Sequence, residues 1–167
     1  TLFALLGHIF SVEDAALALA RQLADALTQA RAVGASRVSE SVLYLIWKNP
    51  WMTVSRDTYV SAMLATVGWK TLPMQADKRY PEIAADDSVW RNADRVFLST
   101  EPYLFDDGHI ATLRDDLHLQ QPIELIDGEM TSWYGVRAIA GLKYLADLRR
   151  RHEQLSPPSP AVQGLIA

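Results

Sequence analysis

The 167-residue sequence contains no cysteine. This absence excludes disulfide bonds and thiolate chemistry. It fits a cytosolic protein and equally an extracytoplasmic protein that avoids thiols, so it does not identify the compartment. A chain of this size can bury roughly 68–70% of its unfolded surface, and a single domain therefore needs neither disulfides nor a metal in order to fold.

The motifs of common catalytic and nucleotide-binding templates are also missing. The sequence has no G-x-S-x-G, no G-x-x-x-x-G-K-[ST], no H-E-x-x-H and no G-x-G-x-x-G. Its histidines are scattered without metal-ligand spacing, and the net charge of −4 gives no basic patch of the kind that binds nucleic acid. We therefore expect a protein that is not an enzyme and that has no nucleic-acid partner.

No apolar run is long enough to span a bilayer. Residues 1–10 are apolar, but no basic region precedes them, and they fall well short of the ~20 residues that a spanning helix needs. We predict neither a signal peptide nor a membrane span. The chain opens on Thr1 within an apolar pattern, so we expect that it has been trimmed, either by processing or by design, in which case any targeting signal would be lost.

The N-terminal part of the chain predicts one long helix. The segment Ser11-Val-Glu-Asp14 has the form of a capping box, and apolar residues recur behind it at spacings of three and four as far as Ala30. The helix is expected to end before Gly34. The preceding apolar residues 2–10 either extend it or pack against it.

Four short segments downstream predict strands, and the run 42–47 is continuously apolar rather than alternating, as in a strand buried on both faces of a parallel sheet. Helical segments lie between them and after the last one. This alternation predicts an α/β fold with a parallel, Rossmann-like sheet of about four strands and helices on both faces, preceded by the long helix. The predicted strands are 42–47, 69–73, 95–98 and 122–126, and the predicted helices are 56–67, 86–92, 106–117 and 136–150.

The loops that follow these strands carry an unusual number of aromatic residues. Ligands of open α/β sheets bind at the carboxyl ends of strands, and aromatic rings with a few polar groups suit a large, partly apolar ligand. The alternative is that the rings cover the end of the sheet or fill a domain interface. The candidate residues are Trp51, Met52, Tyr80, Glu101, Tyr103, Phe105, Met130, Trp133, Tyr134 and Arg137.

The polar residues of these loops allow more than one interpretation. Arg137 could hold a ligand carboxylate or amide, or it could pair with Glu129 or Asp127. Glu101 could accept a hydrogen bond from a ligand or from backbone N–H groups of its own loop. A second hypothesis is a small metal-assisted enzyme in which Glu101, Asp106, Asp127 and Glu129 hold Mg²⁺. A third is that the apolar loops form a dimer interface.

Three segments resemble a known family of transport proteins. IWKNPWMTVSRDTYVSAMLATVGW, ADRVFLSTEPYLF and IDGEMTSWYGVR occur in this order. They resemble the C-terminal lobe of the class III periplasmic substrate-binding proteins of ABC importers, the helical-backbone metal-receptor superfamily. The resemblance extends over residues 12–148. It implies two α/β lobes joined by a long rigid helix, with cobalamin, haem or a ferric siderophore bound between them.

The resemblance also implies how this chain is divided. Residues 1–34 would be the connecting backbone helix, 35–150 the C-terminal α/β lobe and 151–167 an extended Pro-rich tail, and the N-terminal lobe would be missing. The protein would bind a metal chelate without any cofactor of its own and deliver it to an ABC transporter permease. Its location would be the periplasm or, as a lipoprotein, the cell surface.

Individual roles follow from the same resemblance. Met52 and Trp51 would line the cleft after the first strand, and Tyr80 would project toward the ligand. The last cleft loop would contribute Ser132, Trp133, Tyr134 and Arg137. Asp86 would dock on arginines of the permease, with Asp87 or Glu82 as alternatives. Aromatic loops with one clear base favour cobalamin slightly over an anionic siderophore.

Overall fold

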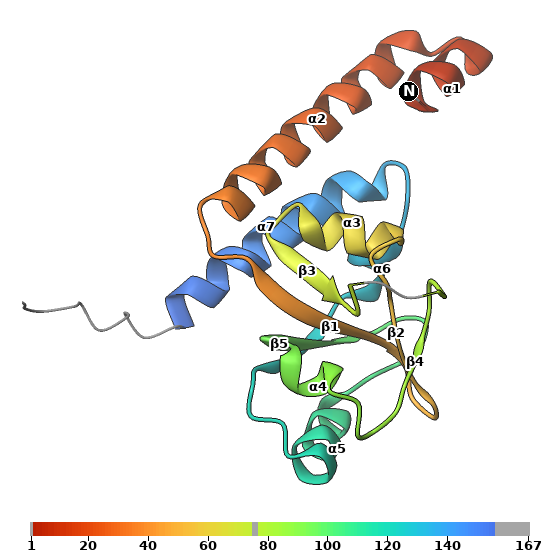
Figure 1. Cartoon of the computed structure of the whole chain (residues 1–167). Coiled ribbons are helices and arrows are strands. Elements are labelled where there is room, and N and C mark those ends of the chain that lie inside the picture. Colours follow the sequence, from red (N-terminus) through yellow and green to blue (C-terminus); the bar gives the residue numbers. More distant parts are fainter. Residues whose placement is uncertain (1, 75–76, 156–167) are drawn as a thin grey trace, which may run out of the picture.

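The computed structural model describes residues 2–74 and 77–155, and the side chains of 2–74 and 77–152 (Figure 1). Most of the predicted Pro-rich tail, residues 156–167, lies outside the described residues. The helices and strands follow one another in the order α1 (Leu2–Phe10), α2 (Glu13–Ala35), β1 (Glu40–Trp47), β2 (Trp51–Thr53), α3 (Tyr59–Ala65), β3 (Trp69–Leu72), β4 (Glu82–Ile83), α4 (Val89–Asn92), β5 (Arg95–Ser99), α5 (Asp107–Leu117), β6 (Ile123–Ile126), α6 (Gly128–Ser132) and α7 (Arg137–Leu155).

Strand β1 is the centre of the sheet. It pairs in parallel with β5, which in turn pairs in parallel with β6. On its other edge, the first half of β1 pairs in parallel with β3, from Glu40 opposite Trp69 to Leu43 opposite Leu72. The four predicted strands are therefore confirmed, and they form one parallel set.

The expectation of a purely parallel sheet is wrong. The second half of β1 pairs with β2 in the antiparallel direction, and β2 pairs in the same way with β4. The reversal begins at Asn49, whose backbone is left-handed with φ of 60°. The chain turns back there directly after Trp47, and a tight reversal of this kind produces an antiparallel pair. The resulting sheet is mixed and has six strands.

Helices cover both faces of the sheet, as predicted. Side chains alternate along β1, so Val42 and Tyr44 face one core while Leu43 and Leu45 face the other. The first core lies under α2, α3 and α7, and the second lies against α4 and α5. Figure 1 shows α3 and α7 on one side of the sheet and α4 and α5 on the other.

The N-terminal segment forms two helices, so of the two alternatives for residues 2–10 the structure shows packing against the long helix rather than its extension. Ser11 has a left-handed backbone with φ of 53°, and Val12 N–H donates to the carbonyl of Gly7 at 2.8 Å, closing α1. The residue that caps α2 is Val12, which makes no side-chain capping bond, so the predicted capping box at Ser11 is wrong. Helix α1 folds back against α2, where a Cβ at Gly7 would lie only 2.5 Å from the Cβ of Ala16.

The last helix is longer than the sequence predicts. It was expected to end at Arg150, but α7 continues to Leu155, so residues 151–155 are helical rather than extended. His152 is buried, and its ring lies 5.5 Å from that of Trp69. Contacts of this kind hold the additional turn of helix against the sheet. No helix within the described ranges is long and apolar enough to cross a membrane.

A charged network joins the end of α7 to the amino ends of the strands. Arg149 Nη1 lies 2.6 Å from Glu40 Oε1, and Arg95 bridges Glu40 at 3.2 Å and Glu124 at 2.6 Å. His152 Nε2 lies 2.9 Å from the second oxygen of Glu124. These side chains are largely withdrawn from water, so the network fixes α7 at the end of the sheet opposite the aromatic loops.

Candidate functional site

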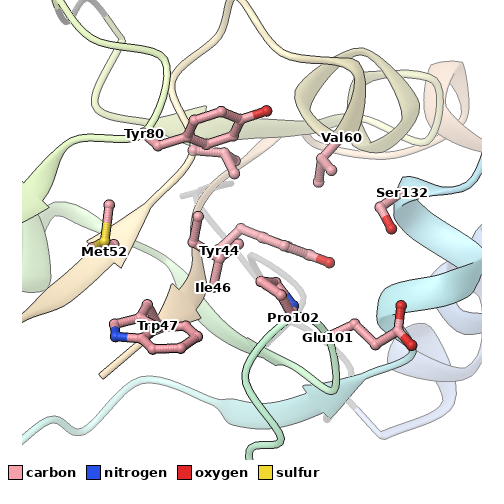
Figure 2. A pocket seen from close by; sticks show the side chains of 10 residues that line it. Tyr44, Ile46, Trp47, Met52, Val60, Tyr80, Glu101, Pro102 and Ser132 are labelled. Carbon is pink, nitrogen blue, oxygen red and sulfur yellow. The ribbon is translucent and has the colours of Figure 1, made fainter. Parts of the chain in front are cut away.

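A pocket of about 400 Å³ opens at the carboxyl end of β1 (Figure 2). Its walls are mostly apolar and aromatic, with a single carboxylate, a serine hydroxyl and two phenols. Pockets of this size and composition are typical of small-molecule sites. The lining residues are Tyr44, Ile46, Trp47, Met52, Val54, Val60, Tyr80, Glu101, Pro102 and Ser132.

The mixed part of the sheet forms the floor of the pocket. Strand β3 ends opposite Leu43, so the second half of β1 does not pair with it. Tyr44 and Ile46, in that second half, line the pocket. The returning strand β2 adds Met52 next to them. Helix α3, the end of α6 and the loops before β4 and after β5 provide the remaining walls. In Figure 2, Tyr80 and Met52 lie on one side of the pocket and Glu101 and Ser132 on the other.

Tyr44 anchors the floor through its hydroxyl. Its Oη lies 2.8 Å from Ser99 Oγ and 2.5 Å from Thr131 Oγ1. Burial raises the pKa of Tyr44 to about 12, although the bonds to Ser99 and Thr131 act in the opposite direction. The phenol therefore stays neutral at physiological pH and joins β1 to β5 and α6 by hydrogen bonds. Ser99 also donates to the carbonyl of Glu101 at 2.6 Å, which positions the loop carrying that carboxylate.

Glu101 and the last aromatic loop form one rim of the pocket. The Nε1 of Trp133 donates to Glu101 Oε2 at 3.2 Å. Arg137 lies with its guanidinium carbon 4.6 Å from the centroid of the Trp133 ring, and it pairs with Glu129 at 2.7 Å. Of the interpretations open for Arg137, the structure therefore shows the pair with Glu129. Arg137 is not among the described residues that line the pocket.

Several of the sequence-predicted residues come together around this pocket. Met52, Tyr80, Glu101 and Ser132 line it, and Trp133 borders it through its bond to Glu101. Met52 comes from β2, Tyr80 from the loop before β4, and Ser132 from the end of α6. Their contact with a ligand stays a prediction.

Two predicted residues point elsewhere. Trp51 precedes Met52 in β2 and faces the opposite side, because strand residues alternate. Its ring lies 5.7 Å from Trp90 and 6.2 Å from Phe105, within the second core. Tyr103 packs behind the pocket, 5.3 Å from the ring of Trp47, and its hydroxyl is 3.2 Å from His109 Nε2.

Phe105 is buried in the second core, whereas Tyr134 and Asp86 lie at the surface. Tyr134 is 70% exposed, and its ring is 4.3 Å from that of Tyr59 rather than in the pocket. Asp86 lies in the exposed turn before α4, which begins at Val89 and not at residue 86. Asp87 accepts from the N–H of Val89 at 2.9 Å, whereas docking of Asp86 on a permease stays a prediction.

The sequence interpretation missed the strand residues of the pocket. Tyr44, Ile46 and Trp47 were assigned to a strand buried on both faces, yet all three line the pocket and Trp47 is 41% exposed. The usable signal was the Asn49-Pro50 pair directly after the run. A reversal at that point implies that the end of the strand is flanked by a short hairpin instead of a full parallel neighbour.

The strand-end carboxylates do not converge. Asp127 accepts from Met130 N–H at 3.1 Å as the cap of α6, and Asp106 caps α5 by accepting from His109 N–H at 3.2 Å. Glu129 pairs with Arg137, and Glu101 accepts from a tryptophan. Within residues 2–74 and 77–155, no group of three His, Cys, Asp or Glu residues could hold a metal ion. The magnesium hypothesis therefore loses its site.

Comparison with known proteins shows that the chain shares a fold with several solved structures. No protein-family model and no curated protein matches the sequence. Among solved structures, the chain is similar to a protein from Staphylococcus epidermidis described as a possible iron-binding (periplasmic solute-binding) protein, with TM-score 0.71 and 20% identity over 89% of this chain and 58% of that chain.

Two further structures match in the same way. The periplasmic heme-binding protein RhuT from Roseiflexus gives TM-score 0.69 and 17% identity, over 89% of this chain and 60% of that one. The periplasmic vitamin B12 binding protein BtuF of Vibrio cholerae gives TM-score 0.60 and 13% identity, over 86% of this chain and 55% of that one. The chain thus spans somewhat more than half the length of each, and over that length it has the fold of class III periplasmic binding proteins.

Proposed function

We propose that this chain is one lobe of an ABC-importer substrate-binding protein. It holds a bulky, largely apolar metal-containing ligand, namely cobalamin, haem or a ferric siderophore, against the pocket at the end of β1. The protein acts in the periplasm or at the cell surface and delivers its ligand to a permease, on which Asp86 docks. The observation that carries this proposal is the apolar, aromatic pocket at the carboxyl edge of a sheet with this fold.

The chemistry of the pocket suits binding rather than catalysis. Aromatic and aliphatic walls bury the apolar surface of a ligand, while the Ser132 hydroxyl and the Tyr80 phenol orient its polar edge. Two of the solved structures with a similar fold are described as heme-binding and vitamin B12 binding proteins. Both are consistent with a large, flat or globular metal chelate as the ligand.

An additional lobe would complete the site. The pocket covers only one side of a ligand of that size, and the chain spans 58% of the Staphylococcus protein. Helix α1 is also rich in exposed apolar side chains, among them Ile9 at 60% and Phe10 at 69% exposure. An apolar surface of this kind usually marks an interface, and the other lobe would cover it.

Binding measurements test the proposal directly. We expect cyanocobalamin, haem or a ferric trihydroxamate to quench the tryptophan fluorescence of this chain in a saturable way, with one site per chain but with weak affinity, because the chain provides only one side of the site. Tyr80→Ala should weaken that binding roughly tenfold, because it removes an aromatic wall. Val38→Ala serves as the control, since Val38 is 87% exposed just before the amino end of β1. A folded protein that binds none of the three compounds would contradict the proposal.

A further inference from the structure

The charged groups that line the pocket are of one sign, negative. Glu101 is the only carboxylate among the described residues that line it, and none of these lining residues is a lysine, arginine or histidine. Tyr44 is held neutral by its burial. A ligand seated here therefore meets one negative charge and no positive charge from the walls of this chain.

The Glu101 carboxylate is not neutralised by a neighbour. It makes no ion pair within the described residues, and its one hydrogen bond is the neutral donation from Trp133 Nε1 to Oε2 at 3.2 Å. Its second oxygen, Oε1, remains available to accept. Figure 2 shows the side chain at the rim, on the same side of the pocket as Ser132.

The basic side chains close in sequence to the pocket residues either contact other groups or do not line the pocket. Arg137 pairs with Glu129 at 2.7 Å, and Arg79 pairs with Asp57 at 3.2 Å. Lys48 lies over the Trp51 ring at 5.5 Å, which faces the opposite core. Lys78 is exposed in the loop before β4 and does not line the pocket.

We infer that Glu101 is a specificity-determining residue, which makes this pocket accept neutral or cationic metal chelates and discriminate against anionic ones. The inference rests on the function proposed above and narrows its ligand class. An anionic group brought against the Glu101 carboxylate loses water and gains repulsion, whereas an ammonium or amide N–H group can donate to Oε1. The aromatic walls bind the apolar part of the chelate in either case.

The test uses ligands that share a scaffold and differ chiefly in charge. One linear ferric trihydroxamate is prepared with a free terminal amine, with the amine acetylated and with the amine succinylated, giving singly positive, neutral and singly negative forms. Cyanocobalamin and its monocarboxylic acid form a second pair, neutral and singly negative. Each is titrated into the full chain, with tryptophan quenching as the readout, at low and at high salt.

The unaltered protein should bind the positive and neutral forms roughly three- to tenfold more tightly than the negative form, and the difference should shrink at high salt. Glu101→Gln keeps the shape of the side chain and removes its charge, so it should abolish most of this difference in affinity between the charged forms. Asp116→Asn removes the same charge from the exposed end of α5, close to the start of β6 and away from the pocket, and should leave the difference unchanged.

Three outcomes would overturn the inference. The first is tighter binding of the negative form, which would mean that Arg137 exchanges Glu129 for the ligand. The second is equal binding of all charges. The third is a preference for positive and neutral ligands that persists in Glu101→Gln. Failure of both scaffolds to bind at all would instead count against the proposed function, so the two failures are distinguishable.

Discussion

The hydroxyl oxygen of Tyr44 lies 2.5 Å from Oγ1 of Thr131, so the central strand is bonded directly to the helix beside the pocket. The same hydroxyl lies 2.8 Å from Ser99 Oγ at the end of β5. One phenol thus joins three elements that are remote in sequence. Because all three hydroxyl groups are buried, none can exchange its partner for water without disturbing the core.

We expect Tyr44→Phe to reduce the free energy of unfolding by about 1–2 kcal/mol, because it leaves two buried hydroxyls with one partner fewer. Urea denaturation followed by circular dichroism measures the change. Tyr134→Phe is the matched control for stability, since Tyr134 is 70% exposed and its ring is retained. Equal stability of both variants would mean that the buried bonds contribute no net stabilisation.

Arg149→Met should be one of the more damaging substitutions on α7. Arg149 is 4% exposed at its side chain, and it donates to Glu40 Oε1 at 2.6 Å and to the carbonyl of Val38 at 2.7 Å. Removing it leaves Glu40 half-buried with a single guanidinium partner, at an expected cost of about 3 kcal/mol.

The neighbouring residue provides the control. Arg150 pairs with Asp147 at 2.6 Å, but its side chain is 48% exposed, so Arg150→Met should cost less than about 1 kcal/mol. Chemical denaturation of the two variants in parallel gives the comparison. Similar losses in both would show that burial does not govern the strength of these pairs.

The protein should lose stability in acid because of the same network. Burial alone would raise the pKa of Glu40 and Glu124. Arg149 and Arg95 nevertheless hold the pKa of Glu40 below its usual range. His152 and Arg95 do the same for the pKa of Glu124. A carboxyl with a depressed folded-state pKa stabilises the fold above its unfolded-state pKa. That contribution is lost as the pH falls through the folded-state pKa.

Unfolding free energies measured across the acid range should therefore fall steeply below about pH 4.3, the ordinary pKa of glutamic acid. Glu124→Gln should be less stable at neutral pH and should show a shallower acid slope. Asp115→Asn, at an exposed position of α5, should retain the slope of the unaltered protein. An unchanged slope in Glu124→Gln would assign the acid sensitivity to other carboxyls.

The two tryptophans on either side of the β1–β2 turn should behave in opposite ways. Trp47 is 41% exposed and lines the pocket, so Trp47→Ala should weaken ligand binding while costing about 1 kcal/mol of stability. Trp51 packs against Trp90 and Phe105, so Trp51→Ala should cost about 3 kcal/mol.

Thermal denaturation and ligand titration of both variants separate the two effects. Binding by Trp51→Ala should be measured below its unfolding temperature, so that loss of fold is not mistaken for loss of affinity. If Trp51→Ala weakened binding more than Trp47→Ala in the folded state, the resemblance-based assignment of Trp51 to the cleft would be favoured over the observed packing.

The parallel part of the sheet was predictable because its strands are buried on both faces. Continuous apolar runs such as 42–47 and 95–98 carry that information in their composition alone. Strands β2 and β4 are too short to show any periodicity, and they exist because the backbone of Asn49 reverses the chain. The break between α1 and α2 was hidden for a similar reason, since the apolar spacing continues across Ser11.

The site was predictable where it consists of loops. Met52 and Tyr80 stood out because aromatic and thioether side chains are unusual in loops, and Glu101 was a candidate because it directly follows a strand. Tyr44 and Trp47 did not, because a strand residue that lines a pocket has the same composition as one in a core. The partner of Arg137 could not be chosen either, since Glu129 and a ligand carboxylate offer the same chemistry to a guanidinium.

Helix α7 is fixed in its last turns and again nearer to its middle. Its last turns are bonded to Glu40 and Glu124, and the hydroxyl of Tyr144 accepts from the N–H of Asp127 at 3.0 Å, next to the pocket rim. The rim therefore rests on a support that is already rigid before a ligand arrives. Its ordering costs little conformational entropy at the moment of binding, so this surface acts as a preformed template whose shape, rather than its adaptability, selects what docks on it.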